Sequence, residues 1–261
     1  MNNKLSGAQM VLVPITKLGE NKFPWVENIR SRFIKYIDFC GSAFLPGTQD
    51  PGLTTTDSMY VTIKNASGNT EIVRNLPLER FDYQITSGAR QPIFSNIALS
   101  DCSVNCQNED AVGKVAAFVF WYDLPDFSAK NSTNNLITDS LSVPLVTKYG
   151  RNQFPDQDRM TGKRFRRIIL GTPSITPDLY EGVAGASLNY IYMTLRKGSY
   201  SILENVPVKL MYQIAMLQKT EFQNIIFDLQ SSYLTIGGDG AWRGADSIIG
   251  QSVFFNMQYE K

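Results

Sequence analysis

The sequence predicts an all-β protein made of two tandem copies of one eight-stranded domain. A series of sequence blocks occurs twice in the same order, and most blocks alternate residue types with a period of two. The chain has 261 residues, enough for two domains of about 130 residues that fill it completely. No long helical periodicity alternates with the strand-like blocks, which argues against a parallel α/β fold.

The clearest repeat is a short segment near the start of each half. VPITKLGENKFP (13–24) reappears as VPLVTKYGRNQFP (143–155), and eight of twelve positions are identical once one inserted residue is allowed. Four more blocks follow in order: Arg30–Ile37 matches Gly162–Ile169, Met59–Lys64 matches Ile191–Arg196, Glu71–Leu78 matches Ser201–Val208, and Lys114–Asp123 matches Gln251–Glu260. A chance match would not hold its order through five blocks. We therefore expect Tyr60 and Tyr192 at equivalent places, and likewise Pro77 and Pro207.

The blocks predict β-strands joined by turns. They are rich in β-branched and aromatic residues, as in YVTIK, YMTLR and VAAFVFWY. Asn65-Ala-Ser-Gly68 and Lys197-Gly198 predict hairpin turns at corresponding places. The next strand of each copy ends in Asn-x-Pro, which predicts a short helix after Pro77 and Pro207.

A polar segment separates the two halves. Asp126–Ser140 (DFSAKNSTNNLITDS) is rich in Ser, Asn and Thr, which is typical of a linker. We expect the first domain, with a short N-terminal arm, in residues 1–127, the linker in 128–140 and the second domain in 141–261. About 130 residues accommodate eight strands of ~5–6 residues with their loops, the size of a jelly roll.

Composition restricts the functions open to this chain. The formal net charge is +1, from 25 basic and 24 acidic residues, which disfavours a dedicated nucleic-acid binder. The chain contains no histidine. Ser-His-Asp catalysis, Cys-His catalysis and the usual zinc sites are therefore excluded, and a metal-binding double cupin is disfavoured. Only chemistry based on carboxylates remains.

The lack of a recognisable targeting signal and the small number of cysteines favour synthesis in the cytoplasm. The longest apolar run, Val115–Tyr122, has eight residues, too few to span a membrane as a helix. The N-terminus lacks the pattern of a signal peptide. Cys40, Cys102 and Cys106 are few and odd in number, as expected in a reducing compartment.

Two clusters are candidate sites. Lys163-Arg164-Phe165-Arg166-Arg167 and its counterpart, which contains Arg30, Arg32 and Lys35, predict a basic strand face in both copies. Such a face is most simply solvated or part of an interface, and contact with lipid headgroups or the genome is the alternative. Cys102 and Cys106 are predicted to be free thiols, with a disulfide or half a metal site as the alternatives.

Three further features are given structural interpretations. Gly237–Asp246 is glycine-rich and holds Asp239 and Asp246, but it matches neither a P-loop nor an EF-hand, so we expect a loop. The glycosylation patterns at Asn65 and Asn131 are expected to be turn and linker residues. Trp121 is expected in the core, and neither it nor Trp242 alone supports a lectin. We therefore predict no catalytic, cofactor-binding or metal-binding residues.

With its two jelly-roll-sized repeats and the aromatic segment VFWYDLP (119–125), the chain resembles the double jelly-roll major capsid proteins. This lineage includes adenovirus hexon and the capsid proteins of tectiviruses, corticoviruses and finnlakeviruses. The small size is most similar to the capsid proteins of tailless, membrane-containing icosahedral bacteriophages, the finnlakeviruses in particular. The resemblance covers the whole chain and rests on architecture and duplication.

The resemblance implies a structural protein of the virion, synthesised in the host cytoplasm, and not an enzyme. It implies a homotrimer whose six barrels form a pseudo-hexagonal capsomer of the capsid lattice. The other implied partners are minor capsid or penton proteins and the lipids of an internal membrane, without specific nucleic-acid binding. A glycan amidase, a lectin and a minor virion protein of the same fold are the alternatives.

Overall fold

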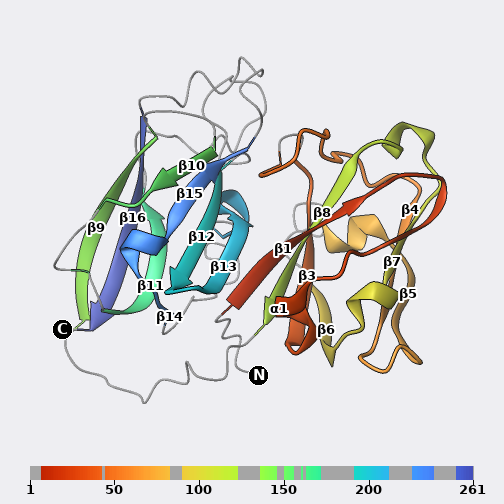
Figure 1. The fold of residues 1–261 in the computed structure, drawn as a ribbon, viewed down its shortest axis with the longest axis horizontal. Helices are drawn as coiled ribbons and strands as arrows, with labels where there is room; N and C mark the ends of the chain where they lie inside the picture. Colours follow the sequence, from red (N-terminus) through yellow and green to blue (C-terminus); the bar gives the residue numbers. More distant parts are fainter. Residues whose placement is uncertain are drawn as a thin grey trace. The chain divides into compact units, whose positions relative to one another are not determined.

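The computed structural model describes residues 7–42, 45–82, 90–122, 136–145, 150–155, 160, 163–171, 191–211, 225–237 and 251–260. The chain forms two compact units, the first containing Ala8–Asp123 and the second containing Leu124–Lys261 (Figure 1). Among the described residues of both units the regular secondary structure is mainly β-strand, so the predicted all-β class is confirmed. No helix among the described residues is long and apolar enough to cross a membrane.

The described part of the first unit has eight strands in two groups of four. The strands are β1 (Gly7–Pro14), β2 (Gly19–Lys22), β3 (Phe33–Cys40), β4 (Met59–Lys64), β5 (Glu71–Pro77), β6 (Gln91–Asn96), β7 (Ser103–Cys106) and β8 (Val115–Tyr122). Their spatial orders are β1-β8-β3-β6 and β2-β7-β4-β5. Short helices lie between them, namely α1 (Glu27–Arg30), η1 (Leu78–Phe81), η2 (Leu99–Asp101) and η3 (Glu109–Ala111).

The described part of the second unit repeats this arrangement. Its strands are β9 (Leu136–Leu145), β10 (Gly150–Gln153), β11 (Arg164–Gly171), β12 (Ile191–Lys197), β13 (Tyr200–Pro207), β14 (Ile225–Ile226), β15 (Tyr233–Ile236) and β16 (Gln251–Glu260), with the short helix η6 (Leu229–Ser231). Their orders are β9-β16-β11-β14 and β10-β15-β12-β13. Counted from its own first strand, each unit therefore has the orders 1-8-3-6 and 2-7-4-5.

The strand registers agree between the units. Tyr60 pairs with Pro77, and Tyr192 pairs with Pro207, so the predicted equivalence of these residues is confirmed. Both hairpin turns predicted from the sequence are present, with Gly68 and Gly198 at positive φ. A 3-10 helix follows Pro77, and residues 208–211 are helical after Pro207, as predicted.

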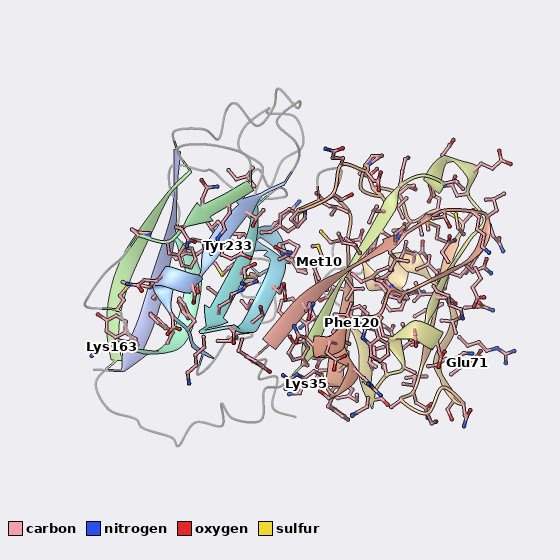
Figure 2. The ribbon with its side chains drawn as sticks, in the orientation of Figure 1. Met10, Lys35, Glu71, Phe120, Lys163 and Tyr233 are labelled. Carbon is pink, nitrogen blue, oxygen red and sulfur yellow. The ribbon has the colours of Figure 1, made fainter. Side chains whose placement is uncertain are left out.

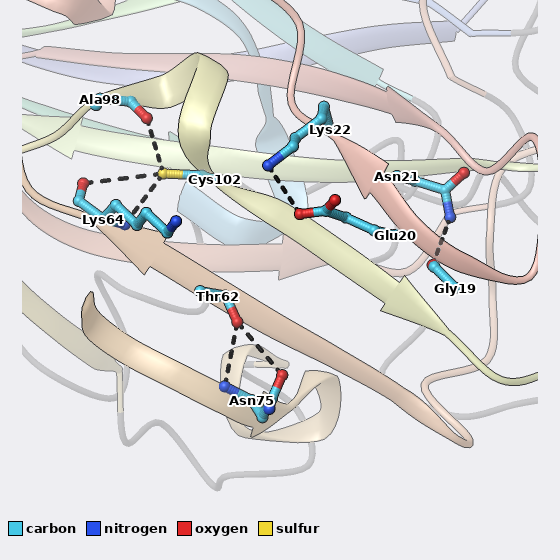
Figure 3. Close-up of polar contacts among 9 residues, drawn as sticks. All are labelled: Gly19, Glu20, Asn21, Lys22, Thr62, Lys64, Asn75, Ala98 and Cys102. Atoms are coloured by element: carbon cyan, nitrogen blue, oxygen red, sulfur yellow. Dashed lines mark hydrogen bonds and ion pairs between the residues drawn. The ribbon is translucent and has the colours of Figure 1, made fainter. Parts of the chain in front are cut away.

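A threonine and an asparagine fix the same irregularity in each unit. Asn75 and Asn205 have φ values of 46° and 52°, which asparagine tolerates better than most residues. The backbone N–H of Asn75 donates to Thr62 Oγ1 at 3.2 Å (Figure 3). In the second unit the backbone N–H of Asn205 donates to Thr194 Oγ1 at 3.1 Å. These asparagines therefore shape a strand bulge at the same place in each unit.

Each core is aromatic and lies between the two sheets. In the first unit the ring of Phe118 on β8 lies 5.0 Å from Phe23, which follows β2 in the opposite sheet. The equivalent pair in the second unit is Phe154 and Phe255, at 6.2 Å. All eight residues of β8 are buried, and Figure 2 shows Phe120 inside the first unit.

The structure corrects one sequence match by a single residue. The repeat paired Phe33 with Phe165, but Ile34 pairs with Tyr122 on β8, as Phe165 pairs with Tyr259 on β16. Ile34 and Phe165 are both fully buried, whereas Phe33 is 46% exposed. Because side chains alternate between faces along a strand, this shift exchanges the residues of the two faces.

The domain limits expected from the sequence are refined in one place. Strand β9 begins at Leu136, so the last five residues of the predicted linker, 136–140, belong to a strand. The polar character of this segment comes from Thr138, Asp139 and Ser140, which a strand also accommodates. Residues 128–135 and the predicted N-terminal arm before Gly7 lie outside the described part of the chain.

Candidate functional site

The most unusual polar feature of the described residues is a buried ion pair in the first unit. Asp38 lies on β3, and Arg90 directly precedes β6, its neighbour in the sheet. Arg90 Nη2 lies 2.6 Å from Asp38 Oδ2, and Arg90 Nε donates to the same oxygen at 3.2 Å. The two side chains are only 2% and 1% exposed. A charge-assisted contact of this kind fixes the geometry of both partners.

Aromatic rings enclose the guanidinium of Arg90. Its Cζ atom lies 4.5 Å from the ring centre of Tyr36 and 4.8 Å from that of Trp121. The indole Nε1 of Trp121 also donates a hydrogen bond to Asp38 Oδ2. Strand alternation places Tyr36 and Asp38 on the face of the sheet opposite to Ile37 and Phe39, which face the core. The cluster therefore lies on the outer face of the sheet.

Burial and the ion pair act against each other on Asp38. Loss of solvent raises the pKa of this carboxyl, while the charge and hydrogen bonds of Arg90 and the hydrogen bond from Trp121 oppose the rise. Asp82, which forms an isolated bridge with Phe39, adds to the rise through its own negative charge. Burial therefore favours the neutral form of Asp38, and Arg90 and Trp121 stabilise its charged form.

The strand registers identify the equivalents of three cluster residues in the second unit, and all three are different residue types. Arg167, Ile169 and Gln258 occupy the places of Tyr36, Asp38 and Trp121. The cluster therefore distinguishes the two units, although their core positions correspond.

The basic residues of the first unit do not form the strand face that the sequence predicted. In the first unit Arg30 ends helix α1 and Arg32 precedes β3, so of the three cations only Lys35 lies on the strand. Arg30 stacks over the exposed ring of Trp25, with Cζ 5.0 Å from its centre. The prediction of a basic strand face in both copies is therefore wrong for the first unit, because the one-residue shift brings Phe33 and Tyr36 to those places.

Cys102 and Cys106 are unpaired thiols, as predicted. Cys102 precedes β7 and Cys106 ends it, and both are fully buried. The thiol of Cys102 lies 3.2 Å from the carbonyl oxygen of Ala98 and accepts a hydrogen bond from the backbone of Lys64 (Figure 3). Burial raises the pKa of this thiol to about 11, so it is not activated for nucleophilic chemistry.

The remaining predicted features divide between described and undescribed residues. Asn65 lies in the β4–β5 hairpin turn, and its side chain accepts a hydrogen bond from Ser67 at 2.8 Å. Trp121 is fully buried, as expected. The linker asparagine Asn131, Trp242 and the glycine-rich segment after Gly237 lie outside the described residues. Within the described ranges, no group of three or more acidic or cysteine side chains is placed to hold a metal ion.

The Asp38–Arg90 cluster is suited to holding a surface rigid and not to proton transfer. Its carboxylate is fully buried and is enclosed by the donors of Arg90 and Trp121 and by aromatic rings. Sequence reasoning missed the cluster because 52 residues separate its two charges. The available signal was an aspartate between the apolar residues Ile37 and Phe39 of the strand FIKYIDFC.

Comparison of the chain with protein-family models, with curated protein sequences and with solved structures finds no match.

Proposed function

We propose that this chain is the major capsid protein of a tailless icosahedral virus and that each unit is a jelly roll. The observation that carries the proposal is the strand order 1-8-3-6 and 2-7-4-5, which occurs in both units. An eight-stranded jelly roll of two Greek keys has two sheets of four strands, and this architecture is common in viral shells.

Two similar units in one chain suit a tile of near-sixfold symmetry. Three copies supply six similar units around a ring, which gives a hexagonal outline from a trimer. The agreement of register and bulge between the units supports this similarity. The net charge of +1 favours protein partners over the packaged genome as the main partner.

The role is structural and not enzymatic under this proposal. The alternatives of the same architecture are a glycan amidase and a lectin, both of which need side chains that converge on a sugar. The unusual side chains of the first unit are enclosed instead, and their contacts stabilise an outer sheet face. Minor capsid proteins and the lipids of an internal membrane are the other partners we propose.

Mass measurement of the purified protein tests the proposal. We expect a trimer, three times the 29.3 kDa chain mass, with an interface above ~1,000 Å² per complex. Negative-stain micrographs of the native source material are expected to show icosahedral particles that contain the chain. A stable monomer at micromolar concentration, together with no such particles, would contradict the capsid role. Turnover of a glycopeptide would favour the amidase alternative.

A further inference from the structure

Exposed aromatic rings occur at the end of the first unit where β3 begins. Trp25 directly precedes the segment that forms α1, and the chain then runs from α1 into β3, whose first residue is Phe33 (Figure 1). These two side chains are 57% and 46% exposed. Phe94 on the neighbouring strand β6 is 45% exposed, and its ring meets that of Tyr36 on β3 at 5.5 Å. Several exposed rings in one region indicate an interaction surface, whereas scattered single ones do not.

The backbone at Phe94 is strained. Its φ of 46° lies in the left-handed region, which bulky side chains rarely adopt. The ladder between β3 and β6 shifts its register at the same place. Such strain persists where the surroundings impose it, and it concentrates at functional positions. Tyr36, which contacts Phe94, also lies 4.5 Å from the guanidinium of Arg90, so the buried ion pair supports this exposed ring.

Positive charge accompanies the rings. Residues 25–36 (WVENIRSRFIKY) contain three cations and one carboxylate, and β6 (QPIFSN) contains no charged residue. Figure 2 shows Lys35 at the same end of the unit as α1. We define the aromatic-basic end as the rings of Trp25, Phe33 and Phe94 with the cations Arg30, Arg32 and Lys35. Its charge is complementary to an anionic partner that also offers an apolar layer.

Arg30 is the cation best placed to bind an anion. Its Cζ atom lies 5.0 Å from the ring centre of Trp25, which holds the guanidinium over an exposed ring. Within the described part of the chain, no hydrogen bond or ion pair occupies its N–H groups. The one nearby carboxylate, Glu27, instead accepts a hydrogen bond from the indole of Trp25 at 3.2 Å. A planar guanidinium of this kind suits a phosphate group.

An anionic bilayer fits this end better than nucleic acid does. Bases bind by stacking on open ring faces, but Arg30 lies over the ring of Trp25 and Arg90 over that of Tyr36. The net charge of +1 also provides little general attraction to nucleic acid. At a bilayer surface, aromatic rings enter the headgroup layer, and arginine and lysine side chains reach the phosphates.

We propose that the aromatic-basic end of the first unit binds the surface of a bilayer that contains anionic phospholipid. Its three rings enter the headgroup layer, and its three cations lie at the level of the phosphates. The inference rests on the proposed capsid role for the source of the bilayer, the internal membrane, and it names the part of the chain that meets this membrane. Because few charges take part, the binding is reversible and weakens as salt is added.

Vesicle binding by the full chain tests the inference. The protein is sedimented with vesicles of phosphatidylcholine alone and with vesicles of phosphatidylcholine mixed with phosphatidylglycerol. The charge variant is Arg30→Gln with Lys35→Gln, and the ring variant is Trp25→Ser with Phe33→Ser. None of these four side chains is buried, so the variants are expected to fold, which circular dichroism checks.

We expect the wild type to bind the mixed vesicles at least about tenfold more tightly than phosphatidylcholine alone. The charge variant and the ring variant are each expected to bind the mixed vesicles at least about tenfold more weakly than the wild type.

Two matched controls are expected to bind as the wild type does. Lys17→Gln with Arg74→Gln removes two exposed cations elsewhere and changes the net charge equally. Leu18→Ser removes an apolar side chain that is 47% exposed in the β1–β2 loop.

Trp25 provides a second measurement at the site itself. Bromine-labelled lipid quenches tryptophan that enters the headgroup layer, and Trp121 is fully buried and therefore protected. We expect quenching of the wild type by mixed vesicles that carry this lipid. Trp25→Phe keeps an aromatic ring and is expected to bind but to lose most of the quenching.

Several outcomes would overturn the inference and leave the capsid role standing. They are trimers that bind no vesicles, equal binding to both kinds of vesicle, and a charge variant that binds as its matched control does. Tighter binding to a single-stranded oligonucleotide than to mixed vesicles, lost in the same variants, would assign this end to nucleic acid instead. A monomer that binds mixed vesicles through this end would contradict the capsid role and leave the inference standing.

Discussion

Replacement of Arg90 by methionine is expected to destabilise the first unit by about 3–5 kcal/mol. The side chains of Arg90 and Asp38 are 2% and 1% exposed, so solvent does not screen the carboxylate that the substitution leaves behind. Methionine keeps an unbranched apolar chain between the rings of Tyr36 and Trp121, so the loss reports mainly on charge. For a unit of this size, the expected fall in the melting temperature is roughly 10–20 °C.

The same variant has a defined pH dependence. Without Arg90, burial raises the pKa of Asp38 further above its ordinary value of 3.8. Below the raised pKa the carboxyl is neutral and costs less to bury, so the defect is smallest in acid. It grows as the pH rises through that raised pKa, because the folded variant must then bury an unpaired charge or retain a proton. Scanning calorimetry at about pH 4 to 8 measures the defect against the wild type.

Two controls separate charge from packing. Arg90→Lys keeps the positive charge but loses the paired N–H donors and is expected to show a smaller defect. Asp38→Asn combined with Arg90→Met removes both charges and retains an acceptor for the indole of Trp121, so most of the stability is expected to return. A defect of Arg90→Met that is independent of pH, or a double variant as unstable as the single one, would refute the reasoning.

Other substitutions test the fold more locally. Asn75→Ala and Asn205→Ala are each expected to lower the free energy of unfolding by about 1–2 kcal/mol, because both residues have a positive φ. Asn75→Gly is expected to lower it less, since glycine adopts positive φ without strain. Equal effects of Ala and Gly at position 75 in urea unfolding would contradict this. Cys102 is expected to resist a thiol reagent in the folded protein at pH 8, where about one thiol in a thousand is ionised, and to react fully in urea. Phe118→Ala is expected to cost about 3–5 kcal/mol, since its ring fills the core between the sheets, and a loss below about 1 kcal/mol would show that the core is described wrongly.

The strands and their equivalences could be predicted because they depend on local patterns. The matches that place Tyr60 with Tyr192, and Pro77 with Pro207, survive in the registers of both hairpins. The offset of one residue at β3 was not predictable in the same way. The sequence match aligned Phe33 with Phe165, whereas the strand pairing and the burial align Ile34 with Phe165. The same bulge follows Ile34 and Phe165 in the two units.

The candidate cluster was beyond sequence reasoning for a different reason. Asp38 and Arg90 are paired by the adjacency of β3 and β6, which is a property of the sheet order and not of any short motif. The strain at Phe94 likewise has no sequence signature, because phenylalanine in a strand normally predicts a regular, half-buried residue. Both features required the assembled sheet to be recognised.

The places where the two units differ indicate what each unit must do. Phe118 and Phe255, which fill equivalent core positions, are the same residue type, as are the bulge residues Asn75 and Asn205. Core positions that differ, such as Ile34 and Phe165, exchange one apolar residue for another. On the outer face, Tyr36, Asp38 and Trp121 of the first unit are instead replaced by Arg167, Ile169 and Gln258. Core positions must stay apolar to preserve the fold that both units share. An outer face that only met water would have no reason to bury an ion pair at such desolvation cost. This divergence is what the proposed capsid role predicts, since in that role the two units keep one architecture while each meets a different neighbour.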